Sequence, residues 1–251
     1  MLPTNQIKAV LFDLGETLLD FGKINTLKFF KEGARLSYDF LKNHDQPVGN
    51  FHIYCWRSLL SLRFHNFISD ISGNDFDSLS LLKKLGISKG VKLTDEQWVE
   101  FVWLWYEPLS RICKTKPETA ETLSQLKRQG IKLGVLSNTF VHSSALERHL
   151  KQLGILDLLD TRLYSYQFEY RKPDPRIFIQ AADTIGERLP NIMYVGDRIN
   201  MDINPTLKLD MYAVLKNAYT NFGKNLPKGA RRITRINELP AIIEKINANS
   251  H

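Results

Sequence analysis

The sequence has few cysteines and no long hydrophobic run. Its 251 residues include only Cys55 and Cys113, too few for the disulfide framework of a small secreted domain and not spaced as metal ligands. No apolar segment reaches the ~18 residues that a membrane span needs, and the first six residues lack the form of a secretory signal. We therefore expect a cytoplasmic globular protein that does not enter a membrane.

Acidic residues are missing from one segment near the end of the chain. Between Asp210 and Glu238 there is no acid, although the net charge of the chain is +7. A basic segment of this kind can bind anions or nucleic acid. Because no nucleic-acid-binding motif accompanies it, we interpret it as a solvated face and expect no nucleic-acid partner. Its basic residues are Lys216, Lys224, Lys228, Arg231, Arg232 and Arg235.

Strands and helices alternate at the start of the chain and again from Thr115 onward. The apolar run that begins at Ile7 predicts a buried strand that ends at Asp13. Alternation of this kind is typical of a parallel sheet covered on both faces, so we predict an α/β fold with a Rossmann-like sheet. The other expected strands are 131–136, 161–164, 191–195, 211–215 and 232–234, and the expected helices are 117–129, 142–153, 201–208, 238–247 and one that starts at Asp174–Pro175.

Between these parts, residues 21–114 have helical periodicity. This segment is too long to be a simple connection between a strand and a helix. We predict helices at 25–43, 50–69, 75–85 and 94–106, the last with a capping box. We therefore predict two domains, a core of residues 1–20 and 115–251 and an inserted helical domain of residues 21–114. Aromatic residues spaced by three and four predict the core of a helical bundle, with a stacking pocket for a ring substrate as the alternative. They are Phe51, Tyr54, Trp56, Phe64, Phe67, Trp98, Phe101, Trp103, Trp105 and Tyr106.

Polar side chains follow several of the predicted strands and loops. Parallel strands bring such residues to one crevice at their carboxyl ends. Carboxylates act there as nucleophiles or as ligands of a hard cation, a hydroxyl and an amide bind phosphoryl oxygens, and a lysine neutralises negative charge. The set predicts a Mg²⁺-assisted phosphoryl-transfer site made of Asp13, Ser137, Asn138, Lys172, Asp197 and Asp202.

Four segments in this order resemble the motifs of the haloacid dehalogenase (HAD) superfamily. Residues 7–18 resemble its first motif, a strand followed by Asp-x-Asp-x-Thr-Leu. Residues 135–138 and 171–175 resemble the second motif and the lysine motif, and residues 195–202 resemble the fourth, Gly-Asp-x-x-x-x-Asp. The resemblance covers essentially the whole chain, and the helical insert resembles the family's cap, which closes over the site and selects the substrate.

The resemblance implies a role for each site residue. Asp13 would attack phosphorus and form an aspartyl-phosphate that water then hydrolyses, and Lys172 would offset the negative charge and position Asp13. Ser137 and Asn138 would hold the phosphoryl oxygens of a small phosphorylated metabolite. Mg²⁺ would be held by Asp13, the carbonyl of Gly15 and Asp197, with Asp202 as a ligand or just behind the ligands. The oligomeric state stays open.

The first motif departs from the family at Gly15, where its phosphatases carry a second aspartate as general acid and base. General acid–base catalysis contributes about 10²–10⁴-fold. Three readings stay open: a substrate whose leaving group needs little protonation, such as an anomeric sugar phosphate; a displaced carboxylate from Glu16; or a catalytically silent binding or regulatory protein. A dehalogenase is disfavoured, since that branch has a bulky aromatic residue at this position.

Arg198 and His142 lie in or near the motifs, and His52 lies in the helical insert; we expect a structural role for each. Arg198 could reach a phosphate, but we expect it to form a salt bridge on its loop. His142 is expected in the first turn of a helix. His52, in the helical insert, has no second ligand at metal spacing, so we expect it to be partly buried.

Overall fold

The computed structural model describes residues 6–113 and 115–250. In this part of the chain the strands form one parallel sheet in the order β3-β2-β1-β4-β5-β6. Because β1 is central and the chain crosses over on both sides of it, the sheet is doubly wound and Rossmann-like, as predicted. The strands are β1 (Ala9–Phe12), β2 (Lys132–Ser137), β3 (Thr161–Tyr164), β4 (Ile192–Gly196), β5 (Tyr212–Lys216) and β6 (Arg231–Ile233).

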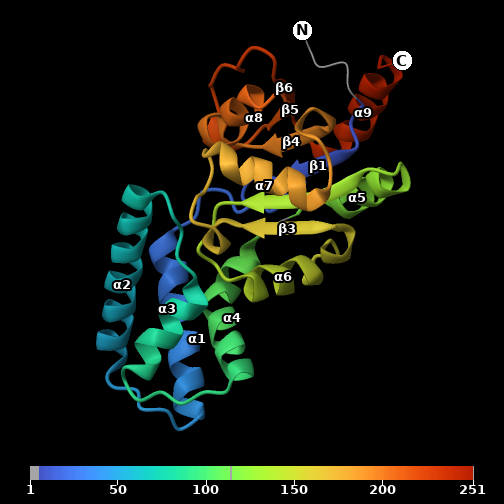
Figure 1. Cartoon of the computed structure of the whole chain (residues 1–251). Coiled ribbons are helices and arrows are strands. Elements are labelled where there is room, and N and C mark those ends of the chain that lie inside the picture. Colours follow the sequence, from blue (N-terminus) through green and yellow to red (C-terminus); the bar gives the residue numbers. More distant parts are fainter. Residues whose placement is uncertain (1–5, 114, 251) are drawn as a thin grey trace.

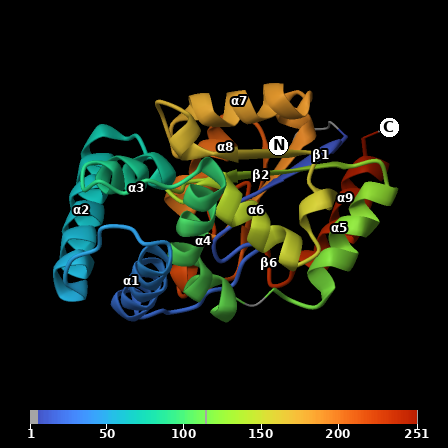
Figure 2. The ribbon, with the colours of Figure 1, turned by 90° about the horizontal axis from the view of Figure 1, so that it is seen from below.

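Helices cover both faces of this sheet and form a separate group beside it (Figures 1 and 2). The group of α1 to α4 falls within the predicted insert, residues 21–114, whose domain boundaries stay a prediction. The helices are α1 (Thr26–Asn43), α2 (Phe51–Ser72), α3 (Ser78–Ile87), α4 (Asp95–Ile112), α5 (Glu118–Arg128), α6 (Ser143–Gln152), α7 (Pro175–Ile185), α8 (Asn204–Lys208) and α9 (Leu239–Ala248). None of the described helices is both long and apolar enough to cross a membrane.

Side chains of the central strand alternate between two apolar layers. Val10 and Phe12 pack with residues of α5, α6 and α9, whereas Ala9 and Leu11 pack with residues of α7. All four are fully buried. Burial on both faces explains why this strand is a continuous apolar run in the sequence, and it holds the end of β1 rigidly in the middle of the sheet.

Two helices differ from their predicted form. The helix predicted at 94–106 continues through Pro108 to Ile112, because apolar packing of this last turn outweighs the hydrogen bond that a proline removes. The helix predicted at 201–208 is a π-helical turn, Ile199–Ile203, followed by the short α8.

Two other element starts also shift. The helix predicted at 75–85 begins at Ser78, since Asp77 caps it by accepting hydrogen bonds from the Leu79 and Ser80 amides. The edge strand predicted at 232–234 runs one residue earlier, at Arg231–Ile233.

The prediction that the aromatic residues of the insert share one core is wrong for α2. Trp98, Phe101, Trp103 and Tyr106 of α4 are buried, but Trp56, Phe64 and Phe67 of α2 are exposed. His52, expected to be partly buried, is also exposed. Helical spacing shows that residues share a face, and it does not show whether that face meets the protein or the solvent.

One basic residue of the acid-free segment is not on a solvated face. Lys216, at the end of β5, is buried, and its ammonium donates to the Glu16 carbonyl at 2.9 Å and to Asp20 at 3.0 Å. The interpretation of a solvated face is therefore wrong at this position. The segment contributes a cation that ties β5 to the loop after β1.

A buried histidine joins the helical group to the sheet domain. The Tyr106 hydroxyl of α4 and Nδ1 of His149 in α6 are hydrogen bonded at 3.0 Å. Burial lowers the pKa of His149 from 6.5 to about 4, and its Nε2 has no partner among the described residues. The folded protein therefore holds this imidazole neutral at pH values where an exposed histidine takes up a proton.

We expect the His149 pKa shift to make the fold acid-sensitive. Between pH 6.5 and about 4 the unfolded chain binds a proton that the folded chain refuses, so stability falls as pH falls. Urea unfolding measures the free energy of unfolding at about pH 7 and about pH 5. Between these values it should fall by about 1–2 kcal/mol more in wild type than in His149→Gln. His52→Gln, at an exposed site, should lose as much as wild type. Equal losses in wild type and His149→Gln would contradict the prediction.

Candidate active site at the carboxyl ends of the strands

The site is built around Asp13, the residue that directly follows β1. Its amide donates to the Val195 carbonyl of β4 at 2.9 Å, which continues the pairing of the two strands. The side chain is nearly buried and lines a cavity of about 270 Å³. Ser137, Lys172, Asp197 and Asp202 also line this cavity, although they follow other strands and loops.

A buried lysine sits among the acids. The Lys172 ammonium donates to Asp13 Oδ1 at 2.7 Å, to Asp202 Oδ1 at 2.7 Å and to the Tyr194 hydroxyl at 2.9 Å. The residue is only 2 % exposed. Burial works to lower the pKa of Lys172, but the carboxylates of Asp13 and Asp202 outweigh it and hold that pKa well above its usual value. Lys172 therefore stays charged.

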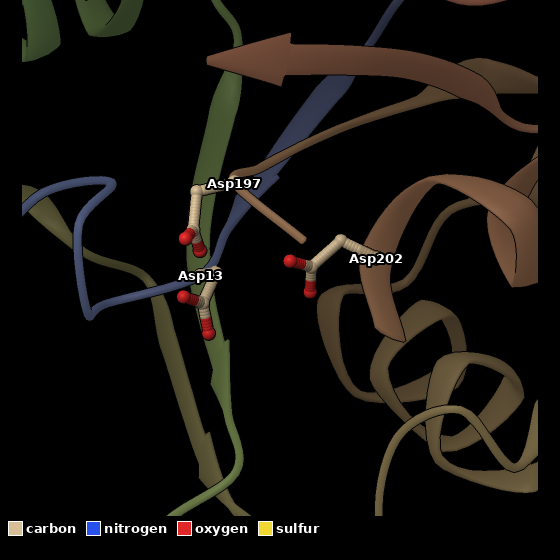
Figure 3. Close-up of side chains that lie close together, drawn as sticks. All are labelled: Asp13, Asp197 and Asp202. Carbon is tan, nitrogen blue, oxygen red and sulfur yellow. The ribbon is translucent and has the colours of Figure 1, made fainter. Parts of the chain in front are cut away.

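The loop after β4 supplies two acids with different partners. Asp197 accepts a hydrogen bond from the Thr220 hydroxyl, while the Asn221 amide donates to its carbonyl at 2.8 Å. Asp202 lies in the π-helical turn, where its Oδ2 accepts from the Arg198 amide at 2.9 Å. Figure 3 shows the side chains of Asp13, Asp197 and Asp202 gathered in one place.

These three acids form a set of donors suited to a divalent cation. One carboxylate oxygen from each lies within 4.8 Å of the other two. Three carboxylates and one ammonium leave a formal charge of minus two in a buried place. Burial raises the pKa of Asp13 to about 7, with Asp202 and Asp197 adding to the effect and Lys172 opposing it. Carboxylate oxygens are the ligands that Mg²⁺ prefers, and one such ion balances the charge.

Ser137 and Asn138, at the end of β2, differ in what their side chains can do. Asn138 Oδ1 accepts from the Lys172 amide at 2.9 Å and its Nδ2 donates to the Lys172 carbonyl at 2.8 Å. This pair of bonds fixes the loop that carries the lysine. The Ser137 hydroxyl lines the cavity and has no hydrogen-bond partner among the described residues, so it is the freer of the two to meet a ligand.

Glu16 is engaged in the loop after β1. Its Oε1 accepts from the amides of Phe21 at 3.0 Å and Gly22 at 2.9 Å, and its backbone is left-handed, with φ 57°. The carboxylate thus closes the turn beside the site, which argues against the displaced acid considered above. Next to it, a Cβ built on Gly15 would meet no atom within 4 Å, so the position of the missing aspartate is open space.

Sequence reasoning missed how two residues, Tyr194 and Arg198, serve the site. Tyr194 lies inside β4, yet its hydroxyl contacts Lys172 and donates to the Leu136 carbonyl at 3.1 Å. A tyrosine within the apolar run 192–195 was the available signal. Arg198 forms no salt bridge in the described part of the chain, so that expectation is wrong; it lines the cavity instead. His142 caps α6 as its N-terminal residue, close to the expectation.

Arg171 ties the helical group to the loop of the catalytic candidate Lys172. Its guanidinium pairs with Asp75 at 2.7 Å and with Asp70 at 2.9 Å. Asp75 also accepts a hydrogen bond from the Ser165 hydroxyl. The segment between α2 and α3 is therefore fixed to the sheet domain directly beside Lys172.

An apolar cavity of about 420 Å³ adjoins the polar one. Ile24 and Leu109 line both cavities. The apolar cavity lies between the helical group and the loop after β2, and its wall includes a stacked pair of rings, Phe76 and Phe140, with centroids 5.0 Å apart. Space for an apolar group thus exists beside the acids.

The fold and the site are those of a Rossmann-like α/β protein with an acidic site at the carboxyl ends of its parallel strands. The model of one family, described as haloacid dehalogenase-like hydrolase, matches residues 7–205. Since this match covers most of the sequence, the chain belongs to the haloacid dehalogenase-like hydrolase family. The predicted superfamily resemblance and fold class are confirmed.

Individual relatives share about a quarter of their residues with this chain. The chain is 27% identical over 217 residues to a glyceraldehyde 3-phosphate phosphatase of Methanopyrus kandleri, covering 83% of each sequence. A HAD phosphatase from Thermococcus onnurineus superposes with a TM-score of 0.60 at 22% identity, covering 94% of this chain and 98% of that one. A 2-haloacid dehalogenase from Pseudomonas syringae gives 0.59 at 23% identity, covering 96% and 99%. At these identities the structural likeness shows the fold alone.

Removal of the buried ammonium should destabilise the protein in a pH-dependent way. Lys172→Ala leaves Asp13 and Asp202 facing each other without a cation, which costs about 3–5 kcal/mol of unfolding free energy at neutral pH without Mg²⁺. The deficit should narrow toward about pH 5, as Asp13, whose pKa burial raises, takes up a proton and the repulsion between the two acids falls. Urea unfolding measures both values, with Lys245→Ala on the exposed side of α9 as the control. A deficit equal at both pH values would assign the loss to packing.

Proposed function

We propose that this protein is a Mg²⁺-dependent phosphatase that hydrolyses a small phosphorylated metabolite through an aspartyl-phosphate. The observation that carries the proposal is the buried Lys172, bonded to both Asp13 and Asp202 at the edge of a cavity that also holds Asp197 and Ser137. Family membership and the name of the Methanopyrus kandleri relative support a phosphatase.

We assign a step to each group of the site. Lys172 occupies Asp13 Oδ1, which leaves Oδ2 to attack phosphorus. The Oδ2–P bond forms while the bond from phosphorus to the ester oxygen breaks, and the departing oxygen takes a proton from water. Water then attacks the aspartyl-phosphate, releasing phosphate and restoring the carboxylate. Ser137 donates to a phosphoryl oxygen, and Asn138 keeps Lys172 in place.

The donor set fits Mg²⁺. Asp13, the Gly15 carbonyl and Asp197 would hold the ion, with Asp202 as a further ligand or just behind the ligands. When bound, Mg²⁺ supplies positive charge next to the phosphoryl oxygens, where charge develops during transfer. The three acids alone repel a phosphate dianion, so we expect the site to bind substrate weakly without the metal.

Two features support a phosphatase over a dehalogenase. Gly15 leaves room where the dehalogenase branch carries a bulky aromatic residue, as the sequence suggests, and the gap beside it is unfilled. The acids Asp197 and Asp202 add negative charge that a metal-free reaction does not use. The apolar cavity past Ile24 and Leu109 can take the non-phosphate part of a substrate.

The direct test is phosphate release from para-nitrophenyl phosphate. We expect wild type to release phosphate with Mg²⁺ and to stop when the metal is chelated. Asp13→Asn should lower the rate on the order of 10³-fold or more, since it removes the nucleophile. Asp210→Asn is the matched control, because that residue is exposed and left-handed, a conformation that asparagine tolerates. No release by wild type, or an unchanged rate for Asp13→Asn, would reject the function.

The open space at Gly15 allows a gain-of-function test. Gly15→Asp should place a general acid near the leaving group and raise hydrolysis of an alkyl phosphate by about 10²-fold, the lower end of general acid catalysis. The gain should be small for para-nitrophenyl phosphate, whose leaving group needs little protonation. Gly15→Asn controls for size. Equal rates for the Asp and Asn variants would show that the carboxyl group does not act as an acid.

A further inference from the structure

The helix α2 turns its most apolar face away from the protein. Its outer stripe consists of Ile53, Trp56, Leu60, Phe64, Phe67 and Ile71, and each of these side chains is 59–69% exposed. Figures 1 and 2 both show α2 at the outer edge of the molecule. A continuous apolar patch of this kind on a globular protein marks an interaction surface.

The opposite face of α2 is the more polar one. Ser58, Ser61 and Asn66 line the apolar cavity inside the helical group, beside Leu59 and Leu62, and Ser69 is buried. A helix that packed only against its own chain would turn these faces the other way round. The outer stripe therefore has the composition of a surface that is buried against another molecule.

We propose that the outer stripe packs against the outer stripe of a second copy of this chain, with the two α2 helices antiparallel. The stripe residues are spaced by 3, 4, 4, 3 and 4 positions, 3.6 on average, so they form a straight row about 27 Å long. A two-fold axis between Arg63 and Phe64 sets Trp56 opposite Ile71 of the second copy and Leu60 opposite Phe67. Phe64 lies beside the axis next to its own copy, and Ile53 lies at the outer end of the contact, so the central pairs are apolar on both sides, as an isologous contact requires.

The size of the stripe fits such a contact. At roughly 100–150 Å² of exposed surface for each large apolar side chain, it offers on the order of 700 Å². One partner in a standard-size interface contributes ~800 Å². Leu85 of α3 lines the same groove as Ile53 and Leu60 and widens the surface.

A membrane surface fits this helix less well. Helices that lie on membranes carry a lysine- and arginine-rich polar face opposite the apolar one. The cavity side of α2 holds Ser58, Ser61, Asn66 and one basic residue, Arg63. Arg57 is the only other lysine or arginine of α2, so this helix lacks the rich basic face of a membrane-bound one. The proposal is independent of the proposed catalytic function, because α2 contributes no acid or lysine of the active site.

The experiment compares assembly states by sedimentation velocity and light scattering over a range of concentrations. We expect wild type to be a dimer. The double variant Leu60→Glu/Phe64→Glu should raise the dissociation constant on the order of 10²-fold or more, since like charges would face each other in the interface. Phe222→Glu, which changes a 90% exposed residue outside α2, should stay dimeric. Far-UV circular dichroism checks that each variant is folded.

Disulfide crosslinking tests the orientation. Phe64→Cys places two thiols next to the axis and should give a covalent dimer on mild oxidation. Ile53→Cys should not, because antiparallel packing separates its two copies by about 31 Å along the helix. A monomeric wild type, a dimer that survives Leu60→Glu/Phe64→Glu, or equal crosslinking at both positions would overturn the proposal. Binding of a monomer to anionic phospholipid vesicles would overturn it in favour of a membrane surface.

Discussion

The active site depends on one buried ammonium. Lys172 bonds to the carboxylates of Asp13 and Asp202, and without it two acids would be buried side by side. The lysine comes from a loop, Asp13 from the central strand and Asp202 from a π-helical turn. Since these bonds form only when all three elements are in place, the charges of the site are balanced only in the folded protein.

The elements around the lysine show how this balance is built. The Asn138 side chain accepts from the Lys172 amide and donates to the Lys172 carbonyl, and the Tyr194 hydroxyl accepts from the Lys172 ammonium. These contacts leave the lysine almost no freedom. The carboxylates of Asp13 and Asp202 hold the charge of this fixed ammonium against burial. The ammonium in turn keeps one oxygen of Asp13 engaged.

The fold and the acids could be predicted because their signals are local. An apolar run that ends on Asp13 marks a buried strand and its carboxyl end, and the parallel topology brings such ends together. The partners of Tyr194 and Lys216 could not be predicted, since these contacts join segments far apart in the sequence. Glu16 binds amides only five and six residues ahead, but its left-handed backbone, which turns the carboxylate toward them, has no signal in the sequence. In α2, helical spacing places Trp56, Phe64 and Phe67 on one face, but the same spacing describes a face buried in the chain and a face exposed to solvent.

The Arg171 pairs with Asp70 and Asp75 have a mechanical consequence. They fasten the last turn of α2 and the segment that follows it to Arg171, the residue that directly precedes Lys172. Any swing of the helical group away from the sheet must either break these ion pairs or pull on the lysine loop. Because Arg171 and Lys172 are adjacent residues, a movement of the helical group that admits a ligand would also shift Lys172, and with it the hydrogen bond that orients Asp13.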